Sequence, residues 1–211
     1  MKQRELPLLK VILAFLIATV IFLSAFLIGY GVAYYKYQSV LKDQQNVIYK
    51  LESLDVEKAF LTSCNREALY SISSELDSMA QAMGILETRL GKNDKQVLEQ
   101  KKIYTILQIK HFLAMKEYKE KCNSNITLIL FFYSNQKEDM GNSERTGFIL
   151  QNLKAQNIND ILVYSIDYHL DLSLVSTLKS VYNITIPDTV LVNEKEKLEK
   201  IQNINDIEAV I

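Results

Sequence analysis

The chain has 211 residues, a formal net charge of −1 and a pI near 6.2. This balance gives no overall basic field, so nucleic acid and other polyanions are disfavoured as partners. The sequence has only 2 prolines, Pro7 and Pro187, and long uninterrupted helices are therefore allowed through its middle.

The first element is an apolar run over residues 11–30, VILAFLIATVIFLSAFLIGY, which contains no charged side chain. A helix of this length spans about 30 Å, the thickness of the hydrocarbon core of a bilayer. The sequence predicts a short tail over residues 1–10 and a transmembrane anchor over residues 11–33 that contacts lipid through residues 11–30. The alternative is a cleaved signal peptide, because Gly31-Val32-Ala33 is a small-residue pattern; the run exceeds the usual signal core of about 7 to 15 residues, which favours a retained anchor.

Positive charges flank this run unequally. Lys2, Arg4 and Lys10 precede it, and Lys36 and Lys42 follow it. The side with more Lys and Arg near a span is usually cytoplasmic. We therefore expect a single-pass protein of the cell membrane, with its N-terminus cytoplasmic and its C-terminal domain extracytoplasmic.

Residues 34–122 are predicted to form a helical stalk and an antiparallel helical hairpin. Apolar positions separated by 3 or 4 residues are typical of one helix face. In the first helix they are Leu61, Cys64, Ala68, Ile72, Leu76, Met79, Met83, Leu86 and Leu90; in the second they are Val97, Tyr104, Leu107, His111, Met115, Tyr118 and Cys122. The turn between them is Gly91-Lys92-Asn93-Asp94, with a glycine to end one helix and an Asn-Asp pair to start the next. The two faces are expected to pack against each other, with His111 as a packing residue.

Cys64 and Cys122 lie at nearly equal distances from this turn, on the same predicted seam. The pattern predicts a disulfide, which would stabilise the fold by about 4 kcal/mol in the chain-entropy model. Such bonds persist in oxidising compartments, in agreement with the outward placement. The alternative is two free, buried thiols that behave as small hydrophobic residues.

The stalk has a second pattern nearer the membrane. Val40, Val47, Leu51 and Leu54 continue the helical rhythm in a more polar stretch. A homodimer through these residues, as a coiled coil that acts as a spacer or signal element, is one alternative use of the stalk.

Residues 123–211 change from helical to alternating strand and helix patterns. Strands are predicted at residues 126–133, 160–167, 189–192 and 198–201, and helices at residues 142–157, 171–182 and 205–211. The order is βαβαββα, a parallel start finished by an antiparallel hairpin. The predicted fold class is thus an α+β membrane protein with a transmembrane helix, a long helical hairpin and an α/β domain built on a mixed four-stranded sheet.

The last 86 or so residues, with ITLILFFYS as first strand, DILVYSID as second and Ile184-Thr185-Ile186-Pro187 before TVLVN, resemble a thioredoxin fold. The resemblance implies that Pro187 is cis and stands beside the family's redox site. The family's Cys-x-x-Cys motif is missing: residues 134–141 read SNQKEDMG. Dithiol exchange at this position is therefore excluded, since the thiolate is the nucleophile. The overall layout also resembles small, single-span archaeal membrane proteins of unassigned function.

The other candidate motifs for metal binding, phosphate binding or catalysis are weak. Asp167, His169 and Asp171 alternate as oxygen and nitrogen ligands of a metal would, but a strand end, a turn and a helix N-cap at Asp171 explain them better. Phosphate-binding glycine loops and a nucleophile elbow are absent, so no cofactor is expected. Asn125 and Asn183 begin N-glycosylation sequons.

We therefore expect a membrane-anchored, extracytoplasmic, non-catalytic thioredoxin-like protein that binds or positions an unidentified protein partner. The alternative is a membrane-tethered thiol-disulfide oxidoreductase in which Cys64 and Cys122 are the working pair. An apolar seam would raise the thiol pKa, which favours the first reading.

Overall fold

The computed structural model describes residues 10–32, 34, 53, 64, 66–157 and 160–211, and for residues 66–72 the backbone alone. The chain divides into two units, Met1–Lys50 and Leu51–Ile211, which are taken separately. The tail over residues 1–9 and the apolar stalk positions Val40, Val47, Leu51, Leu54 and Leu61 lie outside the described residues.

The first unit contains a 23-residue helix, Lys10–Val32, that is long and apolar enough to cross a membrane. Its large side chains point outward; Phe15 and Phe22 are 72% and 69% exposed. The hydroxyls of Thr19 and Ser24 donate to the backbone carbonyls of Phe15 and Ile21, at 2.9 and 2.8 Å. Polar side chains satisfied within the helix suit a lipid environment, where water cannot hydrogen-bond them.

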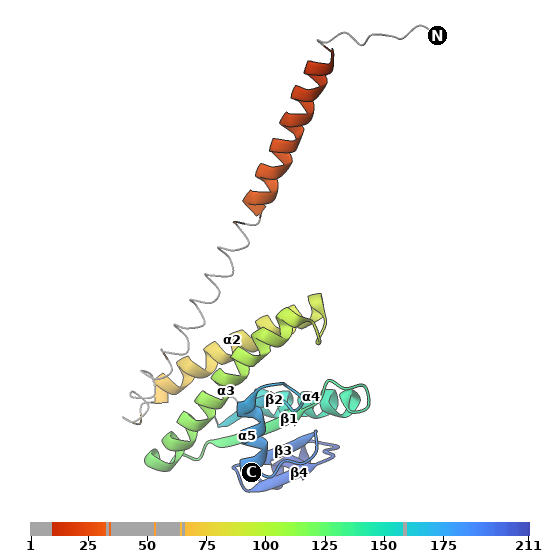
Figure 1. Cartoon of the computed structure of the whole chain (residues 1–211). Helices are drawn as coiled ribbons and strands as arrows, with labels where there is room; N and C mark the ends of the chain where they lie inside the picture. The colour runs from red at the N-terminus through yellow and green to blue at the C-terminus, as the bar shows by residue number, and fades with distance from the viewer. Residues whose placement is uncertain (1–9, 33, 35–52, 54–63, 65, 158–159) are drawn as a thin grey trace. The chain divides into compact units, whose positions relative to one another are not determined.

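The second unit begins with the predicted hairpin, formed by α2 (Arg66–Leu90) and α3 (Lys95–Cys122), which lie side by side in Figure 1. Gly91 has a φ of +93°, and its N–H donates to the carbonyl of Glu87 at 2.8 Å. Asp94 is the N-cap of α3, and its Oδ1 accepts from the N–H of Gln96 at 2.8 Å. The predicted turn chemistry is confirmed.

The second apolar face is also confirmed, but α3 buries more than this face. Val97, Leu107, His111, Met115 and Tyr118 are buried, whereas Leu90 at the end of the first face is 45% exposed. Positions between them on α3 are buried too, among them Ile109 and Phe112, which share a core with the strands. The expectation that the two helices pack chiefly on each other was incomplete, because α3 lies between α2 and a sheet (Figure 1).

The predicted disulfide between Cys64 and Cys122 is present, with 5.6 Å between the Cα atoms. It closes the end of the hairpin opposite the turn. Both cysteines of the chain are used, and neither is a free thiol.

A mixed four-stranded sheet follows, in the order β2-β1-β3-β4. Its strands are β1 (Thr127–Tyr133), β2 (Ile161–Asp167), β3 (Thr189–Val192) and β4 (Glu196–Glu199). β1 and β2 are parallel, whereas β3 is antiparallel to both β1 and β4. β4 begins two residues before the expected position because the turn after β3 is short. The side chains of its Glu196, Lys197 and Glu199 are exposed.

Helices cover both faces of the sheet. These helices are α4 (Met140–Gln156), α5 (Ser173–Val181) and α6 (Asn205–Glu208). Along β1, Leu128, Leu130 and Phe132 pack in one core with α3 and α5, while Ile129 and Phe131 pack in a second core with α4 and α6. Burial on both faces explains why β1 is a continuous apolar run rather than an alternating one.

Two local expectations differ from the structure. The described residues contain no cis peptide bond, so the bond before Pro187 is trans; the chain instead enters β3 through Asp188, whose φ is +59° and whose N–H donates to the carbonyl of Phe132 at 2.7 Å. Asp171 is exposed and does not cap α5, because the helix starts at Ser173 and its N-cap is Leu172.

Candidate functional site

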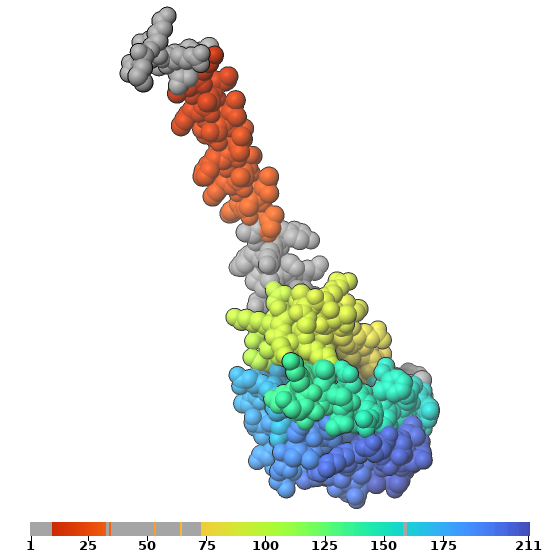
Figure 2. All heavy atoms as spheres, turned by 90° about the vertical axis from the view of Figure 1, so that its right-hand side faces the viewer, coloured from red at the N-terminus to blue at the C-terminus, as the bar shows by residue number. Residues whose placement is uncertain are grey.

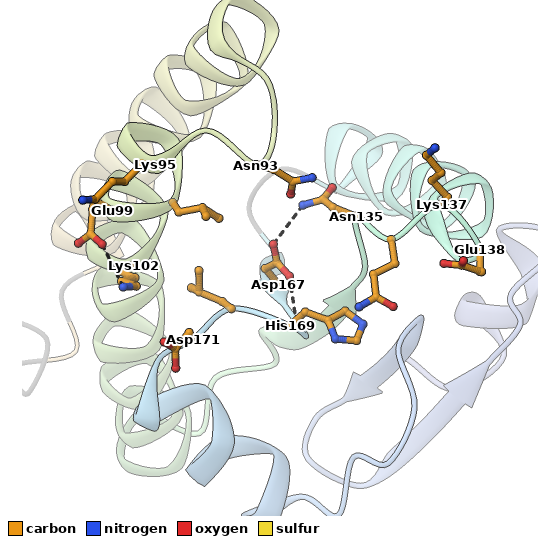
Figure 3. Close-up of a pocket in the computed structure, with 13 residues that line it drawn as sticks. Asn93, Lys95, Glu99, Lys102, Asn135, Lys137, Glu138, Asp167, His169 and Asp171 are labelled. Atoms are coloured by element: carbon orange, nitrogen blue, oxygen red, sulfur yellow. Dashed lines mark hydrogen bonds and ion pairs between the residues drawn. The ribbon is translucent and has the colours of Figure 1, made fainter.

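A cleft of about 680 Å³ lies at the carboxyl ends of the two parallel strands. Its walls are residues of the α2–α3 turn and the first turns of α3, residues 135–138 after β1, and residues 167–171 at and after β2 (Figure 3). Loops that follow parallel strands meet at one edge of the sheet, where open α/β sheets generally bind ligands. The hairpin adds the outer wall.

The floor of the cleft is the buried carboxylate of Asp167. Its Oδ2 accepts from Lys101 Nζ at 3.2 Å and from Asn135 Nδ2 at 3.0 Å, and its Oδ1 accepts from the N–H of His169 at 3.1 Å. Lys101 is 3% exposed and also pairs with Glu87 of α2 at 2.9 Å. One buried cation therefore joins α2, α3 and β2, and each charge in the cluster has a partner, as buried charges require.

Tyr133, the last residue of β1, lies beside this cluster. Lys101 Nζ is 5.6 Å from the centre of its ring, within the range of a cation–π contact. Burial, and after it the negative charges of Asp167 and Glu87, hold the pKa of Tyr133 well above its usual value. The phenol therefore stays protonated and does not act as a base.

The rim of the cleft carries charges of both signs. Lys102 pairs with Glu99 at 3.1 Å, whereas Lys95 and Lys137 have no charged partner among the described residues. The amide side chains of Asn93, Asn135 and Gln136 also line it, together with Glu138, Asp171 and the exposed ring of His169. No described Phe or Tyr lines the cleft, so the ring of His169 is its one aromatic surface among the described residues.

A second polar cluster occupies the place where the thioredoxin resemblance puts its dithiol. Ser143 of α4 donates to the carboxylate of Asp188 and accepts from the N–H of Ser134 at 2.8 Å. The N–H of Gln136 donates to Ser134 Oγ at 3.1 Å. Burial raises the pKa of Asp188, and the bond from Ser143 opposes this rise. The Ser143 hydroxyl is held at both ends and no described histidine contacts it, so it ties α4 to β3 and is not poised as a nucleophile.

The chain matches no known family model, curated protein or solved structure. The site must therefore be judged on its own residues.

The structure separates the predicted site residues. Cys64 and Cys122 are at the end of α3 away from the cleft; the 28 residues of α3 span about 40 Å. Asp167, His169 and Asp171 do line one part of the cleft, but Asp167 is occupied by Lys101, and the described residues contain no group of three metal ligands.

Sequence reasoning missed Lys101 and Glu87. A signal for Lys101 existed: it lies four residues after Val97 and three before Tyr104, so a lysine occupies a position on the apolar face. A charge at such a position needs a buried partner. The identity of the carboxylate that pairs with Lys101 depends on packing between segments 66 residues apart, and the sequence alone does not reveal this packing.

Proposed function

We propose that the protein is a membrane-anchored, extracytoplasmic binding module with a thioredoxin-like fold, and that its cleft binds a polar polypeptide segment of a partner protein. The observation that carries this proposal is the cleft itself, in which a floor of paired, buried charges lies beneath a rim of amide and charged side chains. Preorganised walls lower the entropic cost of binding.

The thioredoxin-like assignment is supported by the βαβαββα order and by the strand order β2-β1-β3-β4 with only β1 and β2 parallel. A non-catalytic role is supported by residues 134–141, which have no cysteine, and by the bonded Ser143–Asp188 pair in their place. Fold alone does not specify function, so these residues, and not the fold, support the non-catalytic role.

An outward location is supported by two independent features. Lys2, Arg4 and Lys10 precede the apolar run of residues 11–30, whereas only Lys36 and Lys42 follow it nearby, which favours a cytoplasmic N-terminus. The Cys64–Cys122 disulfide suits an oxidising compartment. The same disulfide lies far from the cleft, which favours a structural role for it over a redox role beside a bound substrate.

A polypeptide suits the rim better than a flat cofactor. Amide side chains such as Asn93 and Gln136 can each donate to and accept from a peptide backbone. Unpaired charges of both signs, including Lys95 and Asp171, can select charged side chains of the partner. Without Phe or Tyr in the lining, an aromatic ring would gain little from stacking.

The test is site-specific photo-crosslinking of the full chain in its own membrane. A photoreactive residue replaces Lys137 on the rim of the cleft, and in a matched chain it replaces Lys197 on the exposed edge strand β4. We expect one discrete cross-linked protein from position 137 that is lost when Lys95 and Lys102 are changed to glutamate, and no such product from position 197. Equal products from both positions, or a product insensitive to the glutamate changes, would refute the cleft as the binding site.

A further inference from the structure

A buried joint fixes α3 to the edge strand β2 through two residues on successive turns of α3. His111 Nδ1 is 2.9 Å from the hydroxyl of Tyr164 on β2. Gln108, with its amide oriented so that donors face acceptors, donates to the carbonyl of Ser165 at 2.9 Å and accepts from the N–H of Ser165 at 3.2 Å. We call these four residues the α3–β2 joint.

His111 is only 1% exposed, and its other ring nitrogen, Nε2, has no hydrogen-bond partner. A cavity of about 20 Å³ adjoins the ring. This volume admits about one water-sized molecule and excludes any larger counter-ion. A proton added to His111 would therefore place a positive charge where only dipoles can solvate it.

The charged and titratable groups around His111 come from every neighbouring element. Asp77 of α2, Tyr104 of α3, Lys154 of α4 and Tyr164 of β2 all line the same cavity. The one carboxylate among them, Asp77, is already paired with Lys154. Tyr164 and Tyr104 stay protonated, since burial raises the pKa of both. Among the described residues that line this cavity, no free anion is thus available to balance a histidinium.

We propose that the α3–β2 joint is an acid-sensitive latch: it is closed while His111 is neutral, and protonation of the ring loosens α3 from β2. This step moves one proton from solvent to His111 and breaks no covalent bond. The first turns of α3 form the outer wall of the cleft, so opening of the latch would also widen the cleft.

The direction of the effect follows from the histidine. Burial, and after it the charge of Lys154, lowers the pKa of His111 to about 4 from its usual 6.5. The opened state therefore binds a proton more readily than the closed state, and closure weakens as the pH falls from about 6.5 to about 4. The difference of about 2.5 units corresponds to an increase of about 300-fold in the population with an open joint.

The test has two independent measurements on the full chain in detergent micelles. The chain has only 2 histidines, so selective ¹³C labelling gives two signals, and His169 serves as the exposed reference. We expect the His111 signal to stay in the neutral form from pH 7.5 down to about pH 5. A His111 signal that titrates at or above pH 6 would overturn the proposal.

The second measurement is hydrogen exchange of the α3 and β2 amides, corrected for the intrinsic exchange rate at each pH. The opening constant is expected to rise about 200-fold between pH 7.5 and 3.5 in the wild-type chain and to lose most of that rise in His111→Gln, which cannot be protonated. His169→Gln is the matched control and should behave as the wild type. If His111→Gln keeps the full pH dependence, groups other than His111 cause it and the latch is disproved.

Discussion

The two ends of the hairpin are held in opposite ways. The end far from the cleft is closed by the Cys64–Cys122 disulfide, a covalent bond between side chains of low polarity. The end near the cleft is held by Lys101 between Glu87 and Asp167, and by Lys92, which pairs with Glu144 of α4 at 3.0 Å. Figure 2 shows the hairpin against α4 on this face. The disulfide holds its end of the hairpin whether or not water is present, whereas the buried ion pairs of Lys101 are strong only because water is excluded from them.

The two ends of the hairpin also differ in what they can offer a ligand. A disulfide fixes distance but offers a ligand nothing to recognise, while the charge cluster both fixes the helices and presents a polar floor to the cleft. The proposed binding site is thus at the ionic end, and the disulfide supports the covalent end. Variants that affect one end alone can separate the two roles.

The largest loss of stability is expected from Lys101→Met. The change leaves Glu87 and Asp167 buried without their cation, which costs about 3–5 kcal/mol. Hydrogen exchange of the full chain in lipid nanodiscs would measure the free energy of unfolding. The matched control is Lys102→Met on the rim, where the expected change is below about 1 kcal/mol because the pair with Glu99 is largely exposed. Equal losses in the two variants would contradict the assignment of Lys101 to the floor.

A slightly smaller loss is expected when the disulfide is removed in Cys64→Ser/Cys122→Ser. Opening a loop of this length costs about 2–4 kcal/mol, chiefly through the greater freedom of the unfolded chain. The same exchange experiment measures it, and cross-linking from position 137 should persist because the cleft is about 30 Å away along α3. Loss of cross-linking with the fold intact would instead indicate a role for the cysteines in binding.

The smallest effect is expected at the turn, from Asp94→Ala. The Asp94 side chain caps α3 through the N–H of Gln96, and the loss of such a cap costs about 1 kcal/mol. The loss of stability should appear as faster hydrogen exchange of the backbone amides in the first turn of α3. Asp94→Asn keeps a capping oxygen and should retain most of the protection. Equal losses in Asp94→Ala and Asp94→Asn would mean that the carboxylate acts by charge and not as a cap.

Much of this fold could be read from the sequence because its signals are local. The β1 run and the glycine of the turn depend on short-range chemistry, and the equal distances of Cys64 and Cys122 from that turn follow from two regular helices; each has its expected structure. The cleft could not be read in the same way. Lys101 meets Asp167 across 66 residues, and the Gln108 amide meets a strand backbone, so both contacts depend on how α3 lies on the sheet.

The trans bond before Pro187 illustrates the limit of a resemblance. A proline before a hydrophobic strand suggested a cis bond, but the chain turns at Asp188, whose carboxylate is bound by Ser143. A residue in the left-handed region provides the change of direction, and the bond from Ser143 helps to hold it there. The hydrogen bond from Ser143 to Asp188 helps to set the backbone geometry here, and the family pattern does not include this bond.

The exposed charges of β4 and the amide of Gln108 on α3 each protect part of one margin of the sheet. Glu196, Lys197 and Glu199 put charge along one margin, and Gln108 occupies the backbone groups of Ser165 on the other. Unprotected margins recruit extended chains and lead to uncontrolled aggregation, and charge or occupied backbone groups prevent this. Neighbouring chains that meet this sheet therefore have little tendency to add to it as an extra strand.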